Sequence, residues 1–206
     1  RNYIGILTSV NCSATVAKRI AAYFTAERLA AFPNVDGVVA FSHMSGCGMA
    51  KSGPGMDNLR RTIAGYATHP NFAATLIVGL GCEVNQIDPL LDSAGLEVSE
   101  RLQVLGIQDA GGTMAAIDAG VAIIEAMLPA ANACQRELVS AGHLTIGLQC
   151  GASDGYSALT ANPALGSAVD LLVGAGGRAI LSETPEIYGA EDLLLRRAAS
   201  AQVAQD

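Results

Sequence analysis

The sequence contains no tryptophan, and aromatic residues make up only 4% of it, so small aliphatic side chains and glycine must fill the interior. It has no excess of positive charge either: 12 Lys and Arg stand against 19 Asp and Glu, for a net charge of −7. We therefore expect no nucleic-acid partner. No signal peptide is visible, and no apolar run of membrane-spanning length is free of polar or glycine interruptions. These absences predict a cytoplasmic protein without a membrane partner. Because the chain begins at Arg1 and not at methionine, we expect it to be a fragment.

The sequence also lacks any C-x-x-C pair, although it holds five cysteines. The odd count and the wide spacing do not resemble a small secreted disulfide framework, which favours reduced thiols. A zinc-finger spacing is excluded in the same way. Any metal bound by these thiols would need residues from distant parts of the chain to meet in the tertiary structure.

Apolar runs typical of buried strands alternate with segments of helical periodicity. The expected strands are 3–8, 37–42, 74–80, 104–108, 144–148 and 178–181. The expected helices are 13–31, 56–66, 84–94, 113–140, one after Gly155 with a break at Asn162–Pro163, and 190–203. Such alternation predicts an α/β fold: a doubly wound, mostly parallel sheet flanked by helices, as in Rossmann-like or flavodoxin-like three-layer sandwiches. We expect a single domain over residues 1–206.

Four of the cysteines lie in short stretches that follow apolar runs: Cys12, Cys47, Cys82 and Cys150. Ligands of open α/β sheets collect outside the carboxyl ends of the strands, so these thiols could converge on one site. Thiolates bind iron and zinc well, and imidazole or carboxylate completes the usual ligand set. The alternative is that each thiol is simply buried, and Cys12 could equally serve the start of a helix at Ser13. Cys134 lies inside a helical pattern and is expected in the core.

Histidine and carboxylate side chains stand near the same strand ends. His43 precedes Cys47 by four residues and is a candidate ligand or general base, whereas His69 and His143 are expected to be structural. Glu83 follows Cys82 directly. Asp154 follows Cys150 closely, although it would also suit a helix N-cap.

Past the last expected strand, Glu183, Glu186 and Tyr188 could transfer protons or bind hydroxyl groups. The alternative there is a proline turn with solvated glutamates that caps the final helix.

The turn Gly111–Gly112–Thr113 precedes a long helical pattern and could hold an anion at the helix N-terminus. It lacks both the full G-x-G-x-x-G pattern and the P-loop lysine, so nucleotide binding is a weaker hypothesis than binding of a small acid's carboxylate.

Ordered motifs along almost the whole chain resemble the altronate dehydratase and galactarate dehydratase family of sugar-acid dehydratases. They are Arg1–Ile6, Cys12–Ala14, Ser45–Gly48, Gly65–Tyr66 with His69–Asn71, Gly79–Glu83, Gly111–Thr113, Gly147–Gly155 and Ser182–Glu186. Members of that family carry a small N-terminal domain and a further C-terminal region, so the resemblance implies that this chain is a central domain. The remaining domains of the same enzyme are then its expected partners, and self-association is left open.

The resemblance implies removal of water from altronate or galactarate to give a 2-keto-3-deoxy acid, with Fe²⁺ as cofactor, Mn²⁺ as the alternative and an iron–sulfur cluster as a further option. We expect the metal ligands to be Cys47, Cys82 and Cys150, with Cys12 as an additional candidate. Proton transfer is expected from His43, Glu83, Asp154 and Glu186, with His43 alternatively a fourth ligand. Arg60, Gly111, Gly112 and Thr113 are expected to bind the substrate carboxylate. The rival function is a non-catalytic module that binds a sugar acid or a metal.

Overall fold

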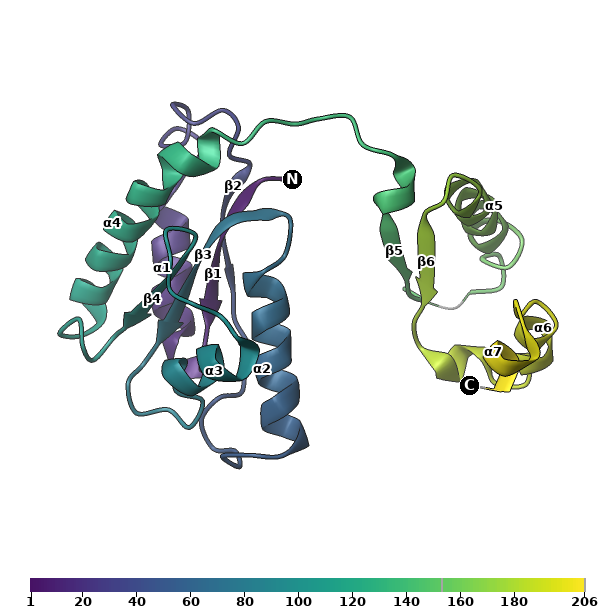
Figure 1. The fold of residues 1–206 in the computed structure, drawn as a ribbon, viewed down its shortest axis with the longest axis horizontal. Helices are drawn as coiled ribbons and strands as arrows, with labels where there is room; N and C mark the ends of the chain where they lie inside the picture. Colours follow the sequence, from purple (N-terminus) through teal and green to yellow (C-terminus); the bar gives the residue numbers. More distant parts are fainter. Residues whose placement is uncertain (153, 206) are drawn as a thin grey trace. The chain divides into compact units, whose positions relative to one another are not determined.

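The computed structural model describes residues 1–152 and 154–205, which form two compact units, Arg1–Arg136 and Glu137–Asp206 (Figure 1). The sequence predicts one domain, whereas the structure divides the chain. The physical reason lies in strand pairing, because the first four strands form one sheet and the last two pair with each other in a second sheet. Each unit is described by itself below.

The sheet of the N-terminal unit is parallel throughout. It contains β1 (Tyr3–Thr8), β2 (Gly37–Phe41), β3 (Phe72–Gly79) and β4 (Leu102–Gly106), in the order β2-β1-β3-β4. Residues of β1 pair with β2 on one side and with β3 on the other. The strand order therefore reverses between β1 and β3, which is where open sheets of this type bind ligands.

Helices cover both faces of this sheet, which confirms the predicted doubly wound α/β fold. They are α1 (Ala14–Tyr23), preceded by a short 3-10 helix at Asn11–Ser13, and α2 (Pro54–Ala67), α3 (Ile87–Ala94) and α4 (Thr113–Asn132). Alternate residues of one strand point to opposite faces. Accordingly, Leu76 of β3 joins the core beneath α1 and α4, while its neighbour Ile77 joins the core beneath α2 and α3.

Two helices of the N-terminal unit end earlier than predicted. α1 ends at Tyr23, because Phe24 leaves helical geometry, and the buried Leu29 reaches the core from a turn. α4 ends at Asn132, so Cys134 lies beyond the helix and is exposed. The prediction of a core position for Cys134 is therefore wrong: the helical pattern continued in the sequence beyond the last residue that packs on the sheet.

α4 is long and apolar enough, by length and composition, to cross a membrane, which the sequence analysis did not expect. In the structure it is a helix of the core. Ala116, Ile124, Leu128 and Ala131 are buried in the cluster that also holds the inner residues of β1 and β3. Its apolar character is explained by this packing.

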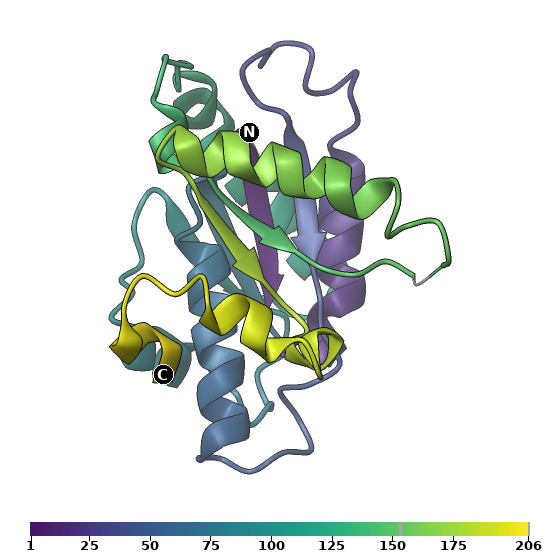
Figure 2. The ribbon, with the colours of Figure 1, turned by 90° about the vertical axis from the view of Figure 1, so that its right-hand side faces the viewer.

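The C-terminal unit is built around two parallel strands, β5 (Thr145–Leu148) and β6 (Arg178–Leu181), joined through α5 (Ala161–Gly174) (Figure 2). The expected break at Asn162–Pro163 is absent, because Pro163 lies in the first turn of α5, where its missing N–H costs nothing. The predicted closing helix is replaced by two short helices, α6 (Glu191–Leu195) and α7 (Ala201–Gln205). Short 3-10 helices at Ala141–His143 and Thr184–Ile187 complete the unit.

Candidate functional site

Three loops that follow strands interlock at the carboxyl edge of the N-terminal sheet. The amide of Asn11, after β1, donates to the carbonyl of Ser45, after β2, at 2.9 Å. The amide of Asn85, after β3, donates to the carbonyl of Gly46 at 3.0 Å. This edge includes the point where the strand order reverses, so the loops expected to carry the site are held against one another.

Glu83 braces the turn that follows β3. Its side chain is only 4% exposed and accepts hydrogen bonds from the Ser9 hydroxyl (2.8 Å) and from the amides of Leu80 (3.1 Å) and Gly81 (2.6 Å). Burial raises the pKa of Glu83, but hydrogen bonds from its own backbone amide and from Ser9, Gly81 and Leu80 outweigh that effect, so the pKa lies below its usual value. Glu83 is therefore held as a carboxylate whose oxygens already have donors. This arrangement suits a brace better than the predicted proton transfer.

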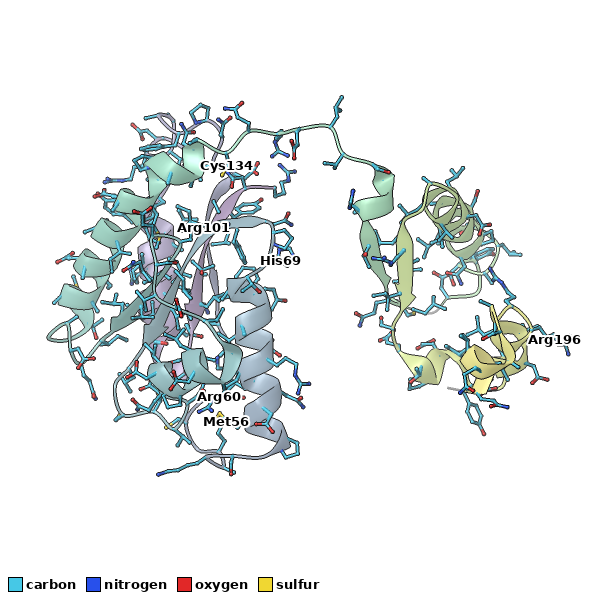
Figure 3. All side chains as sticks on the ribbon, viewed as in Figure 1. Met56, Arg60, His69, Arg101, Cys134 and Arg196 are labelled. Atoms are coloured by element: carbon cyan, nitrogen blue, oxygen red, sulfur yellow. The ribbon has the colours of Figure 1, made fainter. Side chains whose placement is uncertain are left out.

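Asn85 lies fully buried beside Glu83 and joins two further elements. Its side-chain amide donates to the carbonyl of Ser9 at 3.0 Å. Its side-chain oxygen accepts from the Nε of Arg60 at 3.1 Å. Arg60 belongs to α2 (Figure 3). The guanidinium of Arg60, a predicted substrate-binding residue, is thus held at the carboxyl edge by a residue that sequence reasoning did not select.

His43 uses both ring nitrogens within its loop. Nε2 lies 2.9 Å from the carbonyl of Thr8, and Nδ1 accepts from the amide of Ser45 at 3.1 Å. Neutral histidine satisfies both bonds when the proton is on Nε2. While these bonds persist, neither nitrogen offers a lone pair to a proton or a metal, so the geometry favours a positioning role for His43 over the predicted roles.

The thiols of Cys12, Cys47 and Cys82 are all exposed, so they are not core residues. Over residues 1–152 and 154–205, however, no group of three potential ligands that includes any of them comes within 4.8 Å of one another. Cys150 belongs to the C-terminal unit. The predicted set of Cys47, Cys82 and Cys150 is accordingly not assembled within either unit, and it remains a prediction.

The turn before α4 leaves its backbone open to a ligand. Gly111 and Gly112 have φ values of 92° and 115°, which favour glycine, and a Cβ at either position would meet nothing within 4 Å. Their amides donate to the carbonyls of Gln108 and Ile107, so they are used by the turn itself. The first-turn amides of α4, beginning at the exposed Thr113, are left to face an anion.

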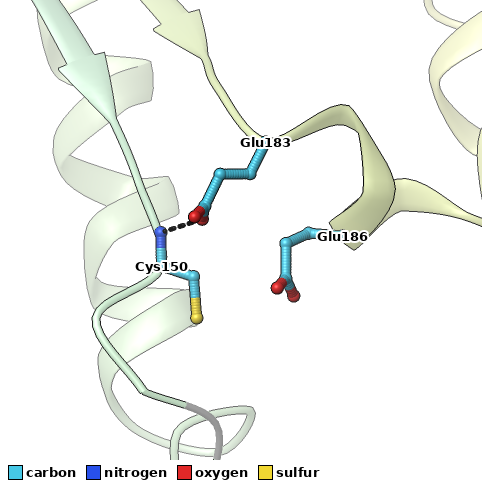
Figure 4. Close-up of side chains that lie close together, drawn as sticks. All are labelled: Cys150, Glu183 and Glu186. Carbon is cyan, nitrogen blue, oxygen red and sulfur yellow. Dashed lines mark hydrogen bonds between the residues drawn. The ribbon is translucent and has the colours of Figure 1, made fainter.

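The C-terminal unit brings three potential metal ligands together at the ends of its two strands (Figure 4). The ligand atoms of Cys150, Glu183 and Glu186 all lie within 4.8 Å of one another, and this is the one such group in the described part of the chain. Glu183 accepts from the amide of Cys150 at 3.0 Å and from the side chain of Gln149 at 3.2 Å. The Cys150 thiol and the Glu186 carboxylate face the same space.

Two further observations concern this cluster. Glu183 has a φ of 59°, the one positive value recorded for a non-glycine residue among those described, and such strain is found at functional sites. Asp154 lies apart from the cluster in role: its Oδ1 accepts from the amides of Tyr156 (2.7 Å) and Ser157 (2.8 Å). It therefore stabilises a turn and does not cap a helix as the alternative interpretation expected, because α5 begins at Ala161 with Thr160 as its N-cap.

Sequence reasoning missed the contributions of Ser9 and Asn85. It named Glu183 as a group for proton transfer or hydroxyl binding, but not as a neighbour of Cys150 in a candidate metal site. Ser9 and Asn85 carried no comparable signal, because a serine and an asparagine in loops are common, and only their burial gives them weight.

Comparison with known proteins gives consistent results for both units. The family model described as D-galactarate dehydratase/altronate hydrolase, second domain, matches residues 1–132. The model described as D-galactarate/altronate dehydratase, C-terminal, matches residues 141–206. The two matches meet close to the division between the two compact units.

Curated relatives cover almost the whole chain. It is 34% identical to an altronate dehydratase of Bacillus subtilis over 98% of its length, and 36% identical to that of Escherichia coli over 95%. A galactarate dehydratase (L-threo-forming) of E. coli is 37% identical over 98%. The chain spans only 38–40% of the length of these relatives. A more distant relative, at 27% identity, is the (2R)-sulfolactate sulfo-lyase subunit beta of Chromohalobacter salexigens. On the strength of the second-domain match over most of its residues, this chain belongs to the D-galactarate dehydratase/altronate dehydratase family.

Proposed function

We propose that this chain provides part of the active site of a metal-assisted sugar-acid dehydratase, which removes water from altronate, galactarate or a related acid to give a 2-keto-3-deoxy acid. The observation that carries the proposal is the interlocking of three strand-end loops through buried Glu83 and Asn85. Such a rigid edge, at the reversal of strand order, is where this fold binds ligands. The names of the relatives supply the reaction class.

The reaction imposes two chemical demands. Removal of the proton α to a carboxylate creates an enediolate with two negative charges, and the β-hydroxide is a poor leaving group. A divalent metal, when bound, would act as a Lewis acid toward these charges. The donor set of Cys150, Glu183 and Glu186 fits Fe²⁺, because a thiolate binds iron well and carboxylates complete the set. Mn²⁺ would depend on the two carboxylates.

The residues of the chain divide into three roles under this proposal. Cys150 and Glu183 would hold the metal, and Glu186 would either complete the set or take the α-proton. Arg60 and the α4 N-terminus at Thr113 would bind a substrate carboxylate. Three exposed thiols, those of Cys12, Cys47 and Cys82, remain proposed ligands for a metal or an iron–sulfur cluster. A cytoplasmic location agrees with metabolism of a small acid.

A second candidate function is a binding module that does not turn over substrate. The coverage of 38–40% favours it, since residues needed for catalysis could lie elsewhere in proteins of this family. In that case the 206-residue chain would bind metal or sugar acid and release no product.

Metal analysis tests the ligand assignment. After anaerobic loading with Fe²⁺, we expect Cys150→Ser and Glu186→Gln to lose metal, whereas Cys134→Ser, a matched change at another exposed cysteine, retains it. Parallel Cys47→Ser and Cys82→Ser variants test the remaining thiols. Unchanged iron content in Cys47→Ser, Cys82→Ser and Cys150→Ser together would reject a thiolate site altogether.

Turnover separates the two candidate functions. The chain is incubated anaerobically with Fe²⁺ and either altronate or galactarate, and the 2-keto-3-deoxy product is measured, with the E. coli altronate dehydratase as positive control. Product above the metal-free blank supports the dehydratase. Binding of the acid or of Fe²⁺ without product supports the module. A chain that forms no product and binds neither the acid nor the metal rejects both candidates.

A further inference from the structure

The C-terminal unit has almost no buried interior. Among its described residues only Gly177 is buried, and large apolar side chains are exposed along its whole length. They include Leu171 of α5 (76% exposed) and the adjacent Ile180 (58%) and Leu181 (55%) of β6. In the N-terminal unit, by contrast, every strand contributes buried side chains to at least one of two clusters. Exposure of so many large apolar side chains in one unit marks an interaction site.

The sheet of this unit is incomplete as well. β5 pairs only with β6 in the described residues, so each strand has one edge with unpaired backbone groups. Both strands are four residues long and parallel. Parallel sheets occur with both faces covered, and two strands alone are at best marginally stable.

Neighbouring residues of a strand point to opposite faces, so the exposure of both Ile180 and Leu181 means that neither face of β6 is fully covered. Leu172 of α5 lies against Gly177, the residue before β6. Among the described residues, no third strand pairs with β5 or β6.

We propose that this surface, defined by β5, β6 and the exposed residues of α5, is an acceptor for further polypeptide of the C-terminal domain of the same dehydratase. That polypeptide would add an apolar strand parallel to a free edge and cover the open face of the sheet. Two observations identify this occupant: residues 141–206 match a C-terminal family model, and the relatives are about two and a half times as long as the part that this chain matches. The inference rests on family membership and not on the proposed reaction.

Hydrogen/deuterium exchange tests the proposal by comparing two proteins, the 206-residue chain and the full-length E. coli galactarate dehydratase. In the chain, we expect the amides of β5 and β6 to exchange at least about 100-fold faster than those of β1 and β3, because an uncovered two-stranded sheet opens easily. In the full-length relative, the segments aligned with β5 and β6 should exchange as slowly as those aligned with β1 and β3.

Light scattering measures the oligomeric state of the chain in the same samples, so that a second copy of the chain bound to the surface is detected. Slow exchange of β5 and β6 in a monomeric chain would overturn the proposal, since the unit would then need no further polypeptide. Slow exchange in a dimer would also overturn it, in favour of a second copy. Fast exchange of the aligned segments in the full-length relative would overturn it too, because nothing would then cover the surface.

A pair of substitutions in the full-length relative adds a second measurement. Aspartate at the position aligned with Ile180 should greatly reduce the yield of folded enzyme, because it would place a charge in the covered interface. Aspartate at the position aligned with Val98, which is 52% exposed here in the N-terminal unit, is the matched control and should leave the yield unchanged. Equal yields for the two variants would contradict the proposal.

Discussion

The buried carboxylate of Glu83 gives a prediction whose sign and size both follow from the structure. Replacing it by alanine removes the acceptor of the Ser9 hydroxyl and of the Leu80 and Gly81 amides. An unsatisfied buried donor costs about 1–3 kcal/mol, so Glu83→Ala should lower the free energy of unfolding of the N-terminal unit by about 3–5 kcal/mol. Glu83→Gln keeps one acceptor oxygen but turns an NH₂ group toward a donor, and should cost about 1–2 kcal/mol.

The same carboxylate makes the stability depend on pH. Hydrogen bonds hold the pKa of Glu83 in the folded protein below its value in the unfolded chain. The contribution of the carboxylate to the free energy of unfolding is therefore complete above about pH 4.5, and it is lost as the pH falls through the pKa of the folded state. Glutamine cannot be protonated in this way. The difference in unfolding free energy between wild type and Glu83→Gln should therefore be largest near neutral pH and shrink on acidification below pH ~4.5.

Hydrogen exchange of the β1 and β3 amides measures this free energy for the N-terminal unit alone, which matters because the chain has two units. Glu97→Gln, at an exposed glutamate of the same unit, is the matched control and should change little. If Glu83→Gln behaved like Glu97→Gln, or if its deficit were the same at pH 7 and pH 3, the carboxylate would not be the brace described here.

Other parts of the N-terminal unit give sharp comparisons. Gly46→Ala should destabilise the protein strongly, because Gly46 has a φ of 97° and an added Cβ would meet the Ser9 carbonyl and Val10. Gly48→Ala should be close to neutral, because a Cβ there meets nothing within 4 Å. Thermal melts compare the two variants, and equal melting temperatures would contradict the close approach at Gly46. Asn85→Ala should lower the free energy of unfolding by about 2–4 kcal/mol, because the carbonyl of Ser9 and the Nε of Arg60 lose their partner. Urea titration followed by circular dichroism measures this loss, with Asn58→Ala on the exposed face of α2 as the control. Ile124→Ala in α4, fully buried, should cost about 2–5 kcal/mol in the same titration, and a smaller loss would mean that α4 does not pack as described.

The fold of the N-terminal unit was predictable because local patterns encode it. The run of β3 is apolar apart from Thr75, which is typical of strands covered on both faces, and β1 begins and ends where the sequence predicts. Helix ends were predicted less well. The pattern that continues past Asn132 has helical periodicity but no sheet to pack on, and periodicity alone cannot reveal where the sheet stops.

The candidate site was predictable only in part. The sequence indicated the loops that carry Cys12, His43, Cys47 and Cys82, and the structure does hold those loops together. It did not indicate what each side chain does there. Glu83 and His43 are residues of types that often act in catalysis. In the structure, however, both ring nitrogens of His43 and both carboxylate oxygens of Glu83 are already hydrogen-bonded.

The sequence by itself determined the alternation of strands and helices, the parallel connections and the family, because these depend on local periodicity and on ordered motifs. Only the tertiary structure decided that the six strands divide between two sheets, that Asn85 and Glu83 brace the loops, and that Glu183 joins Cys150 and Glu186. The physical reason is that pairing of distant strands and burial of polar groups depend on contacts between residues far apart in the chain, which no local pattern records.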